Sequence, residues 1–158
     1  MALLEVKQLT KRFGTTVAVN GIDFVIAEGS CVSLLGPNGA GKTTTLKMLS
    51  GLLPPTTGTI SFPGLQTPDI REHIGYLPQI PAFYNWMSGR EFLTYVGKLA
   101  RMGTKELNKR GDELIELVGL KDARNRRIGG YSGGMRQRLG IAQAMIHRPK
   151  LLMLDEPV

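Results

Sequence analysis

The first part of the chain alternates between apolar and polar positions. Ile22, Phe24 and Ile26 are separated by polar or smaller residues, and glycine-containing turns flank them on both sides. Because successive side chains of a strand point to opposite faces, this pattern predicts a half-buried β-strand. Residues 59–62 alternate again, and residues 75–79 are predicted to be a short strand that runs into a loop. The N-terminal part is therefore expected to be rich in β structure.

Two other segments are almost continuously apolar. Residues 31–35 precede a glycine-rich turn, and residues 151–154 precede the acidic pair Asp155 and Glu156. Short runs of this kind are typical of strands buried on both faces of a parallel sheet, where ligands collect at the carboxyl ends. Cys31, the single cysteine, is accordingly expected to be buried in a strand, and no intrachain disulfide is possible.

From about residue 85 the apolar period changes to that of an α-helix. Ser88 and Glu91 have the spacing of a capping box. Apolar residues then recur at helical spacing in three stretches: Phe92, Tyr95, Val96 and Leu99; Leu107, Leu114, Ile115 and Val118; and Met135, Leu139, Ala142 and Ile146. We therefore predict a core rich in β structure in residues 1–84, a helical subdomain in 85–130, and a helix and strand that return to the core in 131–158.

Composition and charge narrow the class of protein only slightly. The net charge of +7 raises the question of a nucleic-acid partner. The basic residues are mixed with acids and lack the interleaved aromatic residues of a single-strand binding groove, so no nucleic-acid binding is expected. No apolar run approaches the ~18 residues that a membrane-spanning helix needs, and we expect a cytoplasmic protein.

A glycine-rich segment after residues 31–35 carries the clearest chemistry. It matches the phosphate-binding pattern G-x-x-x-x-G-K-[ST], with a predicted strand before it and a predicted helix after it. Glycines let backbone N–H groups surround phosphate oxygens, and the helix N-terminus adds its positive dipole. The expected nucleotide-binding residues are Gly36, Pro37, Asn38, Gly39, Ala40, Gly41, Lys42, Thr43 and Thr44. A turn that merely joins a strand to a helix would explain the glycines but not Lys42 followed by Thr43.

Four further features accompany this segment. Phe13 precedes it, Gln79 follows a short strand, residues 131–138 read YSGGMRQR at the start of a helix, and residues 151–157 read LLMLDEP. In this order, over nearly the whole chain, the set resembles the nucleotide-binding domain of ATP-binding cassette (ABC) transporters, ending just after the Walker B motif. The resemblance implies an α/β fold: a P-loop NTPase core with a mostly parallel sheet, an N-terminal antiparallel β subdomain and a helical insert.

The resemblance also implies roles for individual residues. Phe13 stacks on adenine, although an aromatic residue of a strand core is the alternative. Lys42 holds the β and γ phosphates, and Mg²⁺ is held by Thr43, Gln79 and Asp155. Glu156 acts as the general base in ATP hydrolysis, in which Gln79 and Lys42 also take part. Ser132, Gly133 and Gly134 bind the γ-phosphate of ATP carried by a second copy of the domain.

The implied protein is an ATPase subunit that powers transport by ATP-driven dimerisation. Its partners are a second nucleotide-binding domain, in a head-to-tail dimer, and transmembrane permease subunits, which place it at the inner face of the cell membrane. Two alternatives stay open: a nucleotide-binding fragment without turnover, because the chain ends two residues after Glu156, and a non-transport ABC ATPase. Tyr131 and Met135 depart from the usual signature, which leaves the subfamily open, and neither cargo nor direction of transport follows from the residues.

Overall fold

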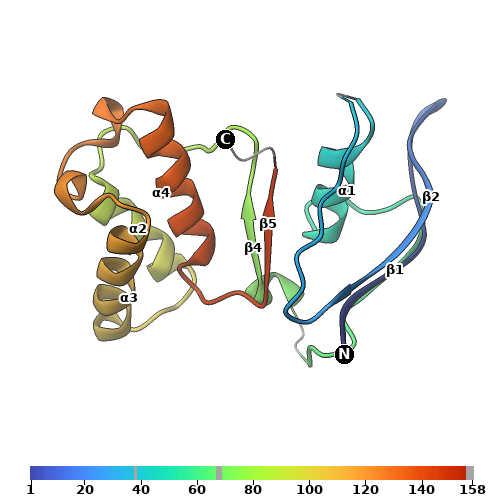
Figure 1. The fold of residues 1–158 in the computed structure, drawn as a ribbon, viewed down its shortest axis with the longest axis horizontal. Coiled ribbons are helices and arrows are strands. Elements are labelled where there is room, and N and C mark those ends of the chain that lie inside the picture. The colour runs from blue at the N-terminus through green and yellow to red at the C-terminus, as the bar shows by residue number, and fades with distance from the viewer. Residues whose placement is uncertain (38, 67–68, 156–158) are drawn as a thin grey trace. The chain divides into compact units, whose positions relative to one another are not determined.

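The computed structural model describes residues 1–37, 39–66 and 69–155. It divides into two compact units, Met1–Arg71 and Glu72–Val158. Figure 1 shows the elements of each unit along the chain. The division into three parts at residues 84 and 130 stays a prediction.

The first unit contains a three-stranded antiparallel sheet in the order β2-β1-β3. Its strands are β1 (Ala2–Phe13), β2 (Thr16–Ala27) and β3 (Thr57–Ser61). The chain turns between β1 and β2 at Gly14, whose φ of 60° favours glycine. Leu4, Val6 and Leu9 of β1 are buried, and a register shift lies between Val6 and Leu9.

The helix α1 (Lys42–Leu49) belongs to the same unit. It buries Thr45, Met48 and Leu49, and the chain leaves it through Gly51 at a φ of 80°. This position agrees with the helix expected after the glycine-rich segment.

Residues 31–35 do not form the buried strand that their apolar character predicts. The segment has no regular secondary structure, Cys31 is exposed, and Leu35 is 90% exposed. A strand needs a neighbouring strand to complete its backbone hydrogen bonds. The described sheet of the first unit is antiparallel and does not include this segment, so apolar composition alone does not make it a strand.

The second unit joins a parallel strand pair to a group of helices. Strand β4 (Ile74–Leu77), which follows the 3₁₀ turn η1 (Ile70–His73), pairs with β5 (Leu151–Leu154) in the register Ile74↔Leu151 to Leu77↔Leu154. Between the two strands lie α2 (Gly89–Leu99), α3 (Thr104–Leu117), η2 (Lys121–Ala123), η3 (Ile128–Gly130) and α4 (Gly133–Met145). The predicted antiparallel subdomain, parallel strands and helical insert are all present.

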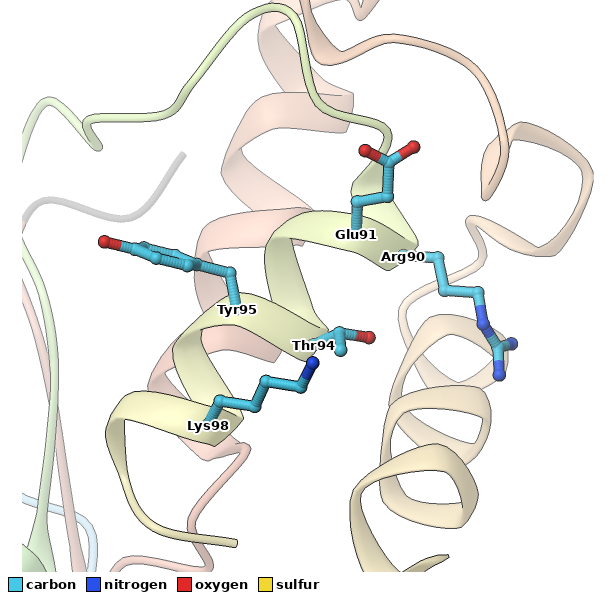
Figure 2. A pocket seen from close by; sticks show the side chains of 5 residues that line it. All are labelled: Arg90, Glu91, Thr94, Tyr95 and Lys98. Carbon is cyan, nitrogen blue, oxygen red and sulfur yellow. The ribbon is translucent and has the colours of Figure 1, made fainter. Parts of the chain in front are cut away.

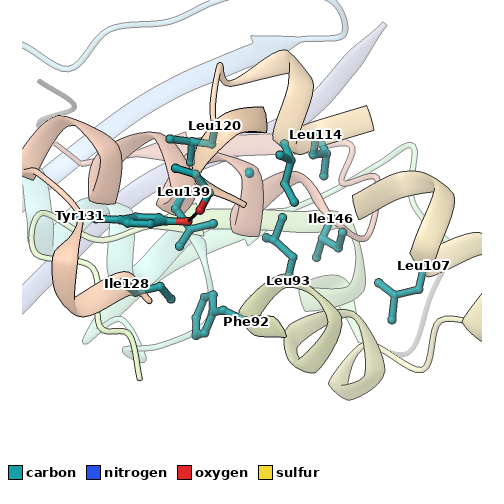
Figure 3. Close-up of a cluster of buried hydrophobic side chains, with 12 residues drawn as sticks. Phe92, Leu93, Leu107, Leu114, Leu120, Ile128, Tyr131, Leu139 and Ile146 are labelled. Carbon is teal, nitrogen blue, oxygen red and sulfur yellow. Dashed lines mark hydrogen bonds between the residues drawn. The ribbon is translucent and has the colours of Figure 1, made fainter. Parts of the chain in front are cut away.

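The helices of the second unit enclose one apolar core (Figure 3). Leu114, Ile128, Leu139 and Ile146 are completely buried in it. Burial of a side chain of this size contributes about 1.5–3 kcal/mol to folding. Most of the periodic apolar positions of α2, α3 and α4 meet in this cluster, whereas Tyr95 and Leu99 of α2 are exposed. Within the described residues, no helix is long and apolar enough to cross a membrane.

Two glycines let α4 approach β4 closely. An ideal Cβ on Gly75 would stand 2.1 Å from the carbonyl oxygen of Ala144, and one on Gly140 would stand 2.6 Å from Leu77 Cδ1. Positions 75 and 77 of the strand therefore meet positions 144 and 140 of the helix. Since the two run in opposite directions, the N-terminus of α4 lies on the same side as the carboxyl end of β4.

Candidate functional site

The glycine-rich segment forms a curled loop that leads into α1. The side-chain ammonium of Lys42 donates a hydrogen bond to the carbonyl oxygen of Gly36 at 2.6 Å. The backbone N–H of Ala40 donates to the carbonyl oxygen of Pro37 at 3.1 Å. Lys42 therefore reaches back over the loop, as a residue that binds terminal phosphates must. Asn38, the remaining predicted binding residue of the loop, lies outside the described residues.

Gly41 fixes the junction between the loop and the helix. It has a φ of 92° and is the N-terminal cap of α1. An ideal Cβ there would stand 2.4 Å from the backbone oxygen of Ala18 in β2. The carbonyl oxygen of Gly41 accepts hydrogen bonds from both the N–H and the hydroxyl of Thr45, at 2.9 and 2.8 Å. Only glycine satisfies both the backbone angle and the close approach.

The first turn of α1 carries residues that are predicted to bind magnesium and phosphate. Lys42, Thr43 and Thr44 are partly buried at the helix N-terminus. No acidic residue occupies this turn, so the positive end of the helix dipole favours an anion here. The loop and this turn together have the chemistry of a phosphate site.

Phe13 lies in the same unit, at the end of β1, where it pairs with Thr16 of β2. Its side chain is 50% exposed. An aromatic ring of a strand core would be buried, so the exposure favours a ring that is available for stacking over the alternative weighed above.

The second unit brings Gln79 and Asp155 to one edge of a strand pair. Gln79 follows β4 and is exposed, whereas Asp155 directly follows β5 and is only 2% exposed. The N–H of Asp155 donates to the carbonyl oxygen of Leu77 at 3.0 Å, which continues the parallel ladder. The predicted base, Glu156, lies outside the described residues.

Tyr76 is a feature of this edge that the sequence analysis did not identify. Its hydroxyl is buried and has no hydrogen-bond partner within the described residues. Burial, and then the negative charge of Asp155, raise the pKa of the Tyr76 hydroxyl. The signal of Tyr76 in the sequence is a polar aromatic residue in an otherwise apolar strand that ends two residues before Gln79.

Ser132 caps the N-terminus of α4, where its hydroxyl accepts a hydrogen bond from the N–H of Met135 at 3.1 Å. Ser132, Gly133 and Gly134 are all exposed. Ser132 lies eight positions before Gly140, and Gly140 packs against Leu77. Eight residues of helix span about 12 Å. The exposed cap therefore extends beyond the edge that holds Asp155, and the two are separate places in the second unit.

Tyr131 anchors this cap to the rest of the helical region. Its side chain is 6% exposed, and its hydroxyl donates to the carbonyl oxygen of Ala123 at 2.6 Å. Burial raises the pKa of the Tyr131 hydroxyl. The tyrosine that departs from the usual signature is thus a buried anchor residue.

The predicted site residues are divided between the two units. Phe13 and the phosphate loop belong to the first, and Gln79, Asp155 and residues 132–134 belong to the second. Within the described residues, no group of three or more His, Cys, Asp or Glu side chains could hold a metal ion. The predicted magnesium ligands are the carboxylate of Asp155, the hydroxyl of Thr43 and the amide of Gln79. A set with one carboxylate suits Mg²⁺, which usually keeps several water ligands.

Comparison with known proteins agrees with these features. A family model described as "ABC transporter" matches residues 19–158. The chain is 54% identical, over 99% of its length, to the uncharacterized ABC transporter ATP-binding protein YxlF of Bacillus subtilis. It is 38% identical to the linearmycin resistance ATP-binding protein LnrL of the same organism and 39% identical to the Nod factor export ATP-binding protein I of Burkholderia lata. It covers 52%, 51% and 53% of these proteins, so the chain spans about half the length of the curated relatives it matches.

Solved structures give the same result. An ATP-binding subunit of an ABC transporter superposes with a TM-score of 0.85 at 30% identity, over 98% of this chain and 66% of that one. CbiO1 from Clostridium perfringens, part of the ABC transporter complex cbiONQ, superposes with a TM-score of 0.85 at 28% identity, over 99% of this chain and 66% of that one.

Proposed function

Because the chain belongs to the ABC transporter family, we propose that it binds ATP with Mg²⁺ and forms part of an ATPase subunit that powers transport. The observation that carries the proposal is the loop closed by Lys42 and Gly36, which leads into the helix that begins at Lys42. A loop of this shape needs glycine at position 41, where the backbone contacts Ala18. The names of the relatives support a transport subunit rather than a non-transport ATPase.

In this proposal each predicted site residue has a specific role. The backbone N–H groups of the loop and the Lys42 ammonium hold the β and γ phosphates, and Thr43 presents its hydroxyl to the metal. Asp155 supplies a carboxylate at the end of β5, with Gln79 at the same edge. Thr43, Gln79 and Asp155 would hold Mg²⁺, which would supply positive charge beside the phosphates. Glu156 accepts the proton of the attacking water.

The separate position of a second predicted anion site supports a head-to-tail dimer. The exposed N-terminus of α4 at residues 132–134 offers N–H groups and a hydroxyl. This N-terminus lies about 12 Å along the helix from Gly140, and it extends beyond the edge that carries Asp155. We propose that this cap binds the γ-phosphate of ATP held by a second copy of the domain.

A docking surface for the permease begins just after Gln79. Ile80 is 84% exposed and Trp86 is 65% exposed. The ring of Tyr84 lies 6.1 Å from that of Trp86 and 5.6 Å from that of Tyr95, which belongs to α2. Tyr95 also lines a hollow of about 300 Å³ along one face of α2 (Figure 2). Exposed aromatic residues beside a hollow are typical of protein-binding surfaces, and a permease partner places the subunit at the inner face of the membrane.

Titration calorimetry with MgATP tests nucleotide binding. We expect Lys42→Ala to lower the affinity for MgATP at least tenfold, because a charged hydrogen-bond donor to the phosphates is removed. Lys47→Ala is the matched control, since Lys47 is exposed on the same helix. Equal affinities of the Lys42→Ala variant and the parent chain would contradict the proposal.

Phosphate release separates an ATPase from a module that only binds. Turnover that disappears in Glu156→Gln, with MgATP affinity retained, supports an ATPase with Glu156 as the base. Binding without turnover in the parent chain supports the second alternative, a nucleotide-binding part that does not hydrolyse ATP by itself.

A further inference from the structure

The ammonium of Lys11 is held between an aromatic ring and a backbone carbonyl. Its nitrogen lies over the ring of Phe13, 5.3 Å from the centroid. The same nitrogen donates a hydrogen bond to the carbonyl oxygen of Pro54 at 2.8 Å. Lys11 and Phe13 are two positions apart on β1, so their side chains share one face of the strand.

The Pro54 carbonyl is itself held close to β1. The N–H of Thr56 donates to the carbonyl oxygen of Thr10, and the N–H of Arg12 donates to the hydroxyl of Thr56, both at 2.9 Å. Segment 54–56 therefore runs beside the end of β1, in the same unit as the phosphate loop. The hydrogen bond to Pro54 consequently holds the Lys11 ammonium in one place.

In this position the Lys11 ammonium interacts with the Phe13 ring. An ammonium over the face of an aromatic ring is attracted by the negative charge of the π system. The half-exposed Phe13 ring would otherwise sample several rotamers, because few contacts restrict a side chain at the end of a strand. Lys11 therefore selects one orientation of the ring before any ligand arrives.

We propose that Lys11 is a positioning residue for the base of the nucleotide. It fixes the Phe13 ring as a platform on which the purine stacks, and it does so without touching the phosphates. The inference rests on the proposed function, in which Phe13 stacks on adenine. It assigns part of the affinity for ATP to a lysine outside the phosphate loop.

Calorimetry with two magnesium-bound ligands, ATP and inorganic tripolyphosphate, tests this role. Tripolyphosphate has the phosphates but no base. Lys11→Met keeps the apolar stem and removes the charge, and we expect it to lower ATP affinity about two- to fivefold, the size of an exposed cation–π interaction. Its affinity for tripolyphosphate should be unchanged. Lys11→Arg should restore ATP binding, and Lys7→Met, at an exposed position of the same strand, is the matched control.

The Phe13→Ala background completes the test. Phe13→Ala should lower ATP affinity on its own, and Lys11→Met should then have no additional effect, because its target is gone. Equal losses of ATP and tripolyphosphate affinity would overturn the proposal and indicate a direct phosphate contact. An unchanged ATP affinity in Lys11→Met would also overturn it while leaving the proposed function intact. Absence of ATP binding in the parent chain would overturn both.

Discussion

The hydroxyl oxygen of Tyr131 lies 2.4 Å from the place that a Cβ on Gly89 would occupy. Gly89 is the first residue of α2, and Tyr131 directly precedes the cap of α4. The tyrosine ring is buried and held by its hydrogen bond to Ala123, so it has little freedom to move aside. The N-termini of α2 and α4 are thereby packed together through a single tyrosine.

The first prediction concerns Gly89. Gly89→Ala should lower the free energy of unfolding by about 1–3 kcal/mol, because the added methyl overlaps a fixed hydroxyl. Gly111→Ala is the matched control within α3, where a Cβ meets no atom within 4 Å. It should raise stability by about 0.5–1 kcal/mol, since alanine favours the helix. Urea unfolding measures both, and equal effects of the two variants would contradict the packing.

The second prediction concerns alkaline pH. Burial raises the pKa of the Tyr131 hydroxyl above its ordinary value of about 10. The folded state then keeps this proton where the unfolded state releases it, so stability is full below about pH 10 and falls as the pH rises through the folded pKa. Burial gives Tyr76 a shift of the same sign.

Urea unfolding from pH 8 to pH 11 measures this dependence. Tyr131→Phe should be less stable than the parent chain at pH 8 by about 0.5–1.5 kcal/mol, because the Ala123 carbonyl loses its donor. It should also lose less stability between pH 9 and pH 11. Parallel curves for the parent chain and the variant would show that Tyr131 does not carry the effect.

The third prediction separates backbone strain from close contact in the phosphate loop. Gly41→Ala should reduce MgATP affinity at least tenfold, because its Cβ meets the backbone oxygen of Ala18 and its φ of 92° disfavours alanine. Gly29→Ala has the same kind of strain, at a φ of 77°, with no atom within 4 Å. It should lower stability by about 1 kcal/mol and leave affinity unchanged. Calorimetry and urea unfolding on both variants check this difference.

The fourth prediction distinguishes the two roles of Ser132. Ser132→Ala should lower the free energy of unfolding by about 1 kcal/mol, because the N–H of Met135 loses its cap. Ser132→Gly should lower it by only a few tenths. If the hydroxyl also binds ATP of a second copy, both variants should weaken ATP-dependent dimerisation, measured by analytical ultracentrifugation. Dimerisation that follows stability alone would assign Ser132 a capping role only.

The local features were predictable from the sequence because their causes are local. The predicted capping residue Ser88 accepts the hydrogen bond that its position suggested. The periodic residues Leu114 and Leu139 are completely buried. Gly119 directly follows the C-terminal cap of α3 at a φ of 73°, a conformation in which glycine often ends a helix. The helix caps, the helical spacing of apolar residues and the helix end all depend on neighbours within about one helical turn. Sequence patterns report such neighbours directly.

The sequence by itself determined the phosphate-loop pattern, the helices and the family resemblance, since these follow from backbone angles, caps and spacing within short segments. Only the tertiary structure decided that residues 31–35 remain exposed, that Tyr131 packs against Gly89, and that Lys11 lies between Phe13 and Pro54. Each of these depends on residues that are distant in the chain, or on whether a neighbouring strand is present. No local pattern specifies which distant backbone or side chain will occupy that space.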